Sequence, residues 1–540
     1  MDHAEQPQQV YIFDTTLRDG GQSEDVSFTI EDKLKLTTVF NDLGVHYVEG
    51  GWPGSNPKDE EYFRLIRGRL SQLKTKVTCF GSTRRIDKTC ETDPNIQKLV
   101  AAEMPAVCIF GKTWTLHVKE ALKINNDQNL EIIESSVSYL KRFHDEVLFD
   151  AEHFFDGYKN NPEYALNALR CAEQAGADFI VLCDTNGGTL PWEVESIFKK
   201  VRSAVSTKLG IHTHNDSEAG VTNSLYAVRE GAKMVQGTFN GFGERCGNCN
   251  LISVISNLSL KMGIESIPQE NIRRLSETSL KVSEMANMSH RKNQPFVGES
   301  AFAHKGGIHV SAIMKNPKTY EHIEPELVGN RRRVLISDLS GISNTVYKVG
   351  ELGLDIELNA DELKLITKKI KAKENQGFTY EAAEASFILL ILRSINRLPS
   401  YFQLDGYRII DERRKDDKDA SSEATIHIVG PNETKVHTVS FGDGPVDALN
   451  NALKKALSGF YPTINDIRLT DYKVRILDSK FGSASKTRVS IDFSDGVDNW
   501  TTMGVYSDII RSSYIALTDS INYKLYLDNK KNECWSVSPP

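Results

Sequence analysis

The sequence predicts a (β/α)8 barrel, followed by a helical connector region and a C-terminal α+β domain. Short apolar runs alternate with longer segments of helical period through the first 270 residues, and this alternation is typical of a parallel sheet. Eight strand-then-helix repeats indicate that the sheet closes into a barrel. A doubly wound sheet is the alternative, but the Gly-rich phosphate fingerprint of that fold does not follow the first apolar run.

The predicted barrel spans residues 1–270 and is built from apolar runs of strand length. These runs are Val10–Thr16, Tyr47–Gly51, Val77–Ser82, Ala106–Gly111, Val147–Ala151, Phe179–Thr185, Gly210–His214 and Met234–Asn240. Segments with helical spacing of apolar residues lie between them, such as Glu31–Leu43, Asn129–Phe143, Pro162–Ala175 and Ser217–Arg229. A chain of 540 residues is too long for one ordinary domain, so we expect two or three.

The rest of the chain changes character twice. Residues 271–410 read mostly as helices, interrupted by the loop Asn293–Gly307, and form the predicted connector region. The charge run Asp411–Glu423 predicts a solvated linker. Residues 424–540 form the predicted C-terminal domain, where alternating strands return and helical stretches follow two of them. Thr438–Leu453 and Thr502–Leu517 both read as strand, turn and helix, which indicates a duplicated unit.

The composition fits a soluble globular protein, with 39% hydrophobic and 26% charged residues. No run of about 18 apolar residues is present, so no membrane span is expected. The polar start Met1–Val10 lacks the pattern of a secretory signal, and we expect a cytoplasmic protein. A net charge of −8 without a basic block argues against nucleic acid as a partner. Eight cysteines scattered along a long chain indicate reduced thiols.

The segment Leu209–Asp216 reads as a short buried strand that ends at His212 and His214. Alternate residues of a strand share a face, so both imidazoles would project into the same space, which is the geometry needed to hold one metal ion. The pair alone is a weak signal, because two histidines at this spacing are often satisfied core or surface residues. A metal site requires a third ligand.

Charged or metal-binding residues also follow most of the other predicted strands. In this barrel class the catalytic groups lie at the carboxyl ends of the strands. The candidates at those ends are Arg18 and Asp19, Glu49, Glu152, Thr185, and Asn248 with its amide oxygen. Any one of the charged residues could form a surface ion pair, typically worth under about 1 kcal/mol. Their common position at one end of the barrel predicts a joint site.

Three motifs resemble those of a known family, the metal-dependent aldol and Claisen barrel enzymes that include 2-isopropylmalate, homocitrate and citramalate synthases. The motifs are Asp14–Gln22, His212–Asp216 and Gly243–Asn248, in the family's order and spacing. Ala301–His309 with Tyr320, and a C-terminal domain like the family's regulatory domain, extend the resemblance over nearly the whole chain.

The resemblance implies roles for the candidate residues. Four would surround a divalent metal ion (Mn, Mg, Co or Zn): Asp19, His212, His214 and Asn248. Three would act on the 2-keto acid: Arg18 as catalytic electrophile, and Glu152 and Thr185 in contact with it. Glu49, at the end of the second strand, is a further substrate-binding candidate. His309, as general base, and Tyr320 would reach a barrel site in a partner chain, so a homodimer is expected.

Within this family, Gly50–Pro57, Asp150–Tyr158 and Cys183–Pro191 are most similar to the longer citramalate synthases. This likeness implies an acyltransferase that condenses acetyl-CoA with pyruvate and hydrolyses the thioester, giving citramalate and CoA for isoleucine biosynthesis. Val310–Ala312 follows His309 where isopropylmalate synthases have Gln-Asp-Gly, which weakens an isopropylmalate interpretation. Gly504–Ser513 resembles the synthases' effector-binding segment, so isoleucine is the expected effector.

Several alternatives remain at this stage. An isopropylmalate or homocitrate synthase would use a different 2-keto acid. A lyase of the hydroxymethylglutaryl-CoA type would be expected to end near the barrel, whereas this chain continues. A non-catalytic amino-acid sensor would be free to lose Arg18 or a metal ligand, and none is lost. The C-terminal domain could also serve only to stabilise a dimer.

Overall fold

The computed structural model describes residues 9–336, 341–352, 354, 356–412, 421–477 and 485–535. The chain divides into two compact units, residues 1–302 with 322–332, and residues 303–321 with 333–540. Residues 1–8, which carry most of the segment on which the absence of a secretory signal was predicted, lie outside the described residues. Within the described residues, no helix has the length and apolar character needed to cross a membrane.

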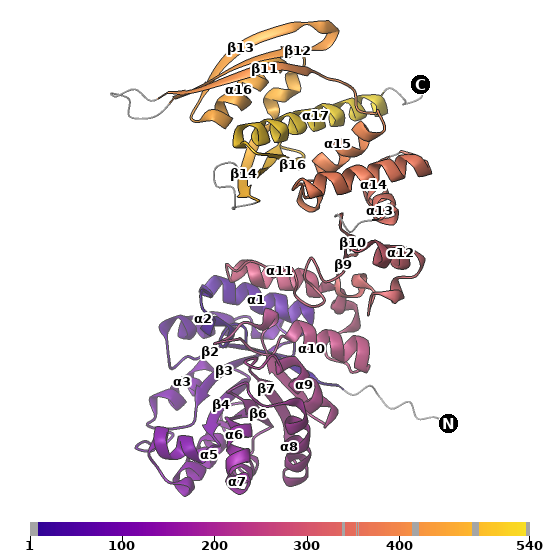
Figure 1. Ribbon diagram of the computed structural model, residues 1–540. Coiled ribbons are helices and arrows are strands. Elements are labelled where there is room, and N and C mark those ends of the chain that lie inside the picture. The colour runs from indigo at the N-terminus through magenta and orange to yellow at the C-terminus, as the bar shows by residue number, and fades with distance from the viewer. Residues whose placement is uncertain are drawn as a thin grey trace. The chain divides into compact units, whose positions relative to one another are not determined.

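The first unit contains a closed barrel of eight parallel strands, each paired with the next and β8 paired with β1 (Figure 1). The strands are β1 (Tyr11–Asp14), β2 (Tyr47–Gly51), β3 (Lys76–Ser82), β4 (Ala106–Lys112), β5 (Glu146–Glu152), β6 (Phe179–Asp184), β7 (Lys208–Thr213) and β8 (Met234–Gly237). The predicted barrel class and all eight predicted strand positions are confirmed.

Helices cover the outside of the barrel (Figure 1). They are α1 (Ile30–Leu43), α2 (Pro57–Arg67), α3 (Pro94–Ala102), α4 (Thr115–His117), α5 (Asn126–Leu140), α6 (Phe154–Asn160), α7 (Pro162–Gln174), α8 (Pro191–Ala204) and α9 (Gly220–Arg229). Their ends follow local sequence signals. Helix α1, for example, begins with a capping box between Thr29 and Asp32 and ends at Gly44, whose φ of 93° suits glycine.

Two kinds of side chain fill the barrel interior. Apolar residues such as Phe13, Leu148 and Phe179 pack together inside the barrel and close it off. Polar side chains are also buried inside the barrel: Glu49, Asp150, His212 and Gln236. Burying so many polar groups is costly unless they are hydrogen-bonded or bind a ligand. These side chains mark the end of the barrel where chemistry is expected.

The chain after the barrel is largely helical, as predicted for the connector. Helices α10 (Leu251–Asn257) and α11 (Leu275–Met285) belong to the first unit. The second unit contains the short paired strands β9 (Ala303–His304) and β10 (Arg333–Val334), and the helices α12 (Gly307–Lys315), α13 (Ile342–Glu351), α14 (Ala360–Asn375) and α15 (Glu384–Ser394).

The C-terminal part of the second unit repeats one architecture, a three-stranded antiparallel sheet followed by a helix. The first repeat is β11 (Gln403–Glu412), β12 (Ser421–Val429), β13 (Lys435–Gly442) and α16 (Pro445–Leu457). The second is β14 (Arg468–Ile476), β15 (Thr487–Ser494), β16 (Asn499–Tyr506) and α17 (Ile509–Trp535). The two strand-and-helix segments that look alike in sequence occupy equivalent places in these repeats, β13–α16 and β16–α17.

The predicted linker is wrong at both of its ends. Asp411 and Glu412 close strand β11, and Ser421 to Glu423 open strand β12, with Ile410 paired to Glu423 across the ladder. Strand β11 was therefore missed, because its outer end is charged and reads as solvated chain. Residues 413–420, the centre of the charge run, lie outside the described residues.

Candidate metal centre and active site

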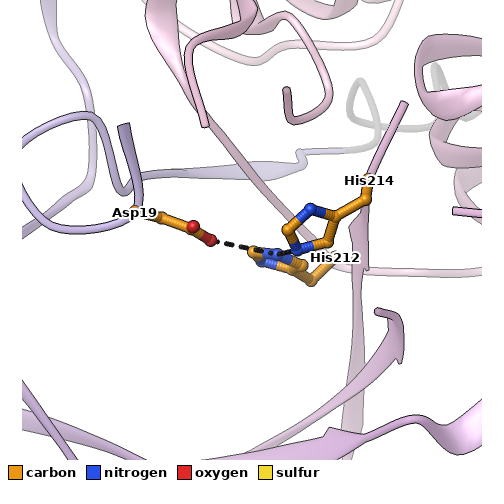
Figure 2. Close-up of side chains that lie close together, drawn as sticks. All are labelled: Asp19, His212 and His214. Atoms are coloured by element: carbon orange, nitrogen blue, oxygen red, sulfur yellow. Dashed lines mark hydrogen bonds and ion pairs between the residues drawn. The ribbon is translucent and has the colours of Figure 1, made fainter. Parts of the chain in front are cut away.

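Three side chains converge at the carboxyl ends of β1 and β7 (Figure 2). The Nε2 atom of His212 lies 3.4 Å from Nε2 of His214 and 3.4 Å from Oδ2 of Asp19. All three residues are buried. Burial alone would raise the pKa of Asp19, but Arg18 and the two histidines outweigh that effect and lower it. Burial, together with the neighbouring His212, lowers the pKa of His214 to about 3, so its imidazole is neutral.

Local backbone structure brings these ligands together. His212 is the second-last residue of β7 and His214 directly follows the strand, so as alternate residues both project inward. Asp19 lies in the turn after β1, where its backbone N–H donates to the carbonyl of Thr15 at 2.9 Å. The loop after β8 returns to the end of β7, where His214 forms a β-bridge with Asn248. Gly247 permits that return, because its φ is 88° and a Cβ there would lie 2.0 Å from the Gly241 carbonyl oxygen.

The donor set fits a divalent metal ion. Two imidazole nitrogens and a carboxylate oxygen face one another within 4.8 Å, a combination that borderline divalent cations accept. The side chain of Asn248 is buried beside them, and neither its Oδ1 nor its Nδ2 has a hydrogen-bond partner in the described part of the chain. A buried amide without a partner is costly, and Oδ1 acting as a fourth ligand would remove that cost.

Arg18 is held rigidly beside the metal ligands. Its Nε donates to Oε2 of Glu49 at 2.6 Å, its guanidinium carbon lies 3.7 Å from the centre of the Phe80 ring, and its Nη1 is 3.5 Å from Oδ2 of Asp19. Glu49 also accepts from the Thr15 hydroxyl. Glu49 therefore holds the Arg18 guanidinium in place next to the three converging ligands.

Glu152 ends β5 and Thr185 directly follows the neighbouring β6, at the same end of the barrel. Glu152, at the end of β5, forms an ion pair with Lys112 at the end of β4. The backbone N–H of His153 donates to the Thr185 hydroxyl at 2.9 Å, which leaves the hydroxyl hydrogen free to point elsewhere. Arg245 donates to the Thr185 carbonyl at 2.8 Å and pairs with Asp216, which ties the β6 and β7 loops together.

His309 and Tyr320 belong to the second unit. Their rings stack with centroids 4.1 Å apart, and both residues are exposed. The adjacent Ile308 is also highly exposed, at 81%. The pair is thus preassembled within its own unit and available to a ligand or a partner.

Sequence reasoning missed Lys112, Gln236 and Phe80. Lys112 is the last residue of β4, the same strand-end position that identified the other candidates, but the predicted strand stopped one residue earlier. Gln236 is a polar residue inside an otherwise apolar strand, which was the available signal. Phe80 contacts Arg18 through its ring face, and a buried aromatic residue in a strand reads as ordinary core.

A closed (β/α)8 barrel with this donor set at its carboxyl end has the arrangement of a metal-dependent barrel enzyme. Comparison with known families agrees. Residues 9–288 match the HMGL-like family, residues 296–377 match the homocitrate synthase post-HMGL domain-like family, and residues 381–525 match the LeuA allosteric (dimerisation) domain. The chain belongs to the HMGL-like family, whose condensing members use a divalent metal and acetyl-CoA.

Its curated relatives match over almost their whole length. The (R)-citramalate synthase of Aquifex aeolicus is 52% identical over 97% of this chain and 99% of that protein. The (R)-citramalate synthase of Geobacter sulfurreducens is 51% identical over 96% and 98%. The 2-isopropylmalate synthase of Methanocaldococcus jannaschii is 30% identical over 96% and 95%. The resemblance predicted from the motifs is confirmed, and the chain is an enzyme of the acetyl-CoA-dependent condensing kind.

Proposed function

We propose that this protein catalyses the (R)-citramalate synthase reaction, in which acetyl-CoA and pyruvate condense and the thioester is hydrolysed to citramalate and CoA. The observation that carries this proposal is the 52% identity to a curated (R)-citramalate synthase over nearly the full length of both chains. The converging ligands Asp19, His212 and His214 support it, because the reaction needs an activated ketone.

Asp19, His212, His214 and Asn248 would hold the divalent cation, which when bound polarises a ketone and orients a 2-keto acid. Arg18, fixed by Glu49 and Phe80, stabilises the negative charge that develops on the former keto oxygen. The Thr185 hydroxyl and the Glu152 carboxylate lie at the same end of the barrel and orient the rest of the 2-keto acid. Preorganised groups of this kind cost little reorganisation during the reaction.

His309 acts as the general base. A neutral imidazole can take a proton from the methyl group of acetyl-CoA near neutral pH. The carbanion formed then attacks the ketone carbon, and water subsequently hydrolyses the thioester. Tyr320 stacks on the His309 ring and orients it. The match to a LeuA dimerisation domain supports a homodimer, in which we propose that His309 and Tyr320 serve the barrel of the partner chain.

A small 2-keto acid suits the wall beside Arg18. Phe80 lies 5.6 Å from Trp52 and 5.6 Å from Phe110, measured between ring centroids, so aromatic rings from β3, β4 and the loop after β2 form one apolar surface. Arg18 packs against this surface through Phe80. An apolar wall suits a 2-keto acid with an apolar substituent, and the identity to citramalate synthases favours the methyl group of pyruvate.

The test of this function is CoA release measured with four 2-keto acids: pyruvate, 2-ketobutyrate, 2-ketoisovalerate and 2-ketoglutarate. We expect pyruvate to give the highest kcat/KM, and the product to be citramalate by mass and chirality. One extra methylene in an apolar pocket typically changes kcat/KM by about 10–200-fold. A clear preference for 2-ketoisovalerate would contradict the proposal and favour the isopropylmalate reaction.

We further propose that the C-terminal sheets and helices sense isoleucine, the end product expected for a cytoplasmic citramalate synthase. The match to an allosteric domain supports a regulatory role. Helix α17 packs tightly against β16 within the segment Gly504–Ser513: a Cβ on Gly504, inside the strand, would lie 1.9 Å from the Ser512 carbonyl oxygen in the helix. In the first turn of α17 the Asp508 carboxylate accepts from the Ile510 N–H at 2.9 Å, and we propose that a ligand carboxylate binds there by displacing the Asp508 side chain.

Millimolar isoleucine is expected to inhibit the full-length enzyme, and leucine and valine are expected to inhibit less. Gly504→Ala should lose this inhibition while retaining the uninhibited rate, because the added methyl group would push α17 away from β16. Gly459→Ala is the matched control, since a Cβ there meets no atom within 4 Å. An unchanged rate and an unchanged KM for pyruvate with all three amino acids would leave the domain with a structural role only.

A further inference from the structure

Three buried side chains, Asp150, Gln236 and His212, form a line of hydrogen bonds inside the barrel that ends at the metal ligand His212. The carbonyl Oε1 of Gln236, on β8, lies 2.9 Å from Nδ1 of His212. The amide Nε2 of Gln236 donates to Oδ1 of Asp150, on β5, at 2.9 Å. Gln236 is completely buried, and Asp150 and His212 are 4% and 5% exposed. Both ends of the Gln236 amide are therefore used inside the protein.

The carboxylate at one end fixes the direction of every hydrogen bond in this line. Burial raises the pKa of Asp150, and its Oδ1 accepts from the Gln236 amide, because the Nε2 atom of that amide can only donate. Gln236 must therefore turn its NH2 group toward Asp150 and its carbonyl toward His212. The facing Nδ1 of His212 must then carry the proton and donate it. A histidine that binds a metal does so as a neutral ring, and in a neutral ring protonated on Nδ1 the lone pair is on Nε2, the atom that faces Asp19 and His214.

We propose that Gln236, oriented by Asp150, is a positioning residue that holds His212 in the tautomer whose Nε2 lone pair binds the metal. The inference rests on the proposed metal site. Gln236 touches neither the substrate nor the cation, and it acts through the ring of His212. Histidine ligands commonly donate their second N–H to an acceptor, and loss of that acceptor typically weakens metal binding about 10–100-fold.

The test is binding of Co²⁺ to the metal-free full-length protein, followed by its visible absorption and by the dissociation constant, without any activity assay. Gln236→Met keeps the length of the side chain but offers His212 no strong acceptor, and we expect its Kd for Co²⁺ to rise about 10–100-fold. Gln236→Glu is expected to stay near the parent value, because a carboxyl group sharing one proton with Asp150 still accepts from Nδ1. Asp150→Asn is expected to weaken binding. An amide at position 150 can donate as well as accept, so every hydrogen bond in the line can reverse, and the proton of His212 can then lie on Nε2.

Cys108→Ala is the matched control. The Cys108 sulfur is equally buried, lies 3.9 Å from Nε2 of Gln236 and also hydrogen-bonds Asp150, but a thiol is too weak a donor and acceptor to set the direction of the line. This variant should bind Co²⁺ like the parent. His212→Ala tests the metal site independently of Gln236, because unchanged Co²⁺ affinity in that variant would refute the site itself.

Two outcomes would overturn the role of Gln236 while leaving the metal site intact. One is parent-like Co²⁺ affinity and absorption in Gln236→Met. The other is Gln236→Glu binding as weakly as Gln236→Met, which would show that side-chain shape matters and the acceptor does not. If Gln236→Met does not fold, Asp150→Asn, which preserves every side-chain size, decides alone: parent affinity in that variant overturns the proposal.

Discussion

Replacing His212 with alanine is expected to abolish metal binding and condensing activity while the barrel stays folded. His212 contributes the Nε2 atom that faces both Asp19 and His214 at 3.4 Å. Its loss removes a direct ligand, so metal affinity should fall by more than the about 10–100-fold typical of losing an outer partner. Without the cation the ketone is no longer activated, and activity should fall with metal content.

The barrel should stay folded in His212→Ala, because the cost of losing this side chain is small compared with the stability of a domain. The side chain of His212 bonds to Gln236 and to the site, and His212 is not part of the hydrophobic core of the barrel. Leaving the Gln236 carbonyl unpaired costs about 1–3 kcal/mol, whereas domains are typically stable by about 5–15 kcal/mol. The folded population therefore survives.

The measurement is metal content by elemental analysis, together with CoA release and the far-ultraviolet circular dichroism spectrum. His144→Ala is the matched control, because His144 is equally buried but bonds the Met104 carbonyl at 2.8 Å, outside the site. It should keep both metal and activity. Full activity at normal metal content in His212→Ala would show that the site has been placed wrongly.

The barrel could be predicted from the sequence because each strand has its own local signal. An apolar run bounded by helical segments defines a parallel strand wherever it occurs, and eight such runs leave one simple closure. Strand ends then predict the site, because Arg18, His212 and Glu152 each follow an apolar run. Strand β11 lacked that signal: its outer end is charged, and pairing with β12 rather than local pattern makes it a strand.

Contacts across the barrel could not be predicted in this way. Asp150 and Gln236 lie 86 positions apart and meet only because β5 and β8 face the same interior. The ion pair between Lys112 and Glu152 likewise depends on the register of β4 against β5, which places these two residues opposite each other. Register depends on how the two strands pair, because a slip of one residue moves every side chain to the other face, and the strand ends were predicted only to within a residue.

Arg18 is expected to contribute to the rate without contributing to metal retention. Its guanidinium is fixed by the Glu49 carboxylate at 2.6 Å and by the Phe80 ring at 3.7 Å, beside the ligands rather than among them. A lysine carries the same charge, but it lacks the planar group that can bond Glu49, stack on Phe80 and face the site at once. Arg18→Lys therefore keeps the charge and loses its placement.

Arg18→Lys is thus expected to lower kcat by about 10²–10³-fold, the usual effect of removing one preorganised donor to a developing oxyanion. Metal content and Co²⁺ absorption should stay at the parent level, which distinguishes this variant from His212→Ala. Arg84→Lys is the matched control, since Arg84 is buried and bonds Ser135 at 2.8 Å and Glu131 at 2.8 Å away from the site. That variant should change thermal stability and leave kcat unaltered. If Arg18→Lys instead loses the metal, the guanidinium of Arg18 acts by holding the ligand Asp19 in place. Its assignment as the catalytic electrophile would then be wrong.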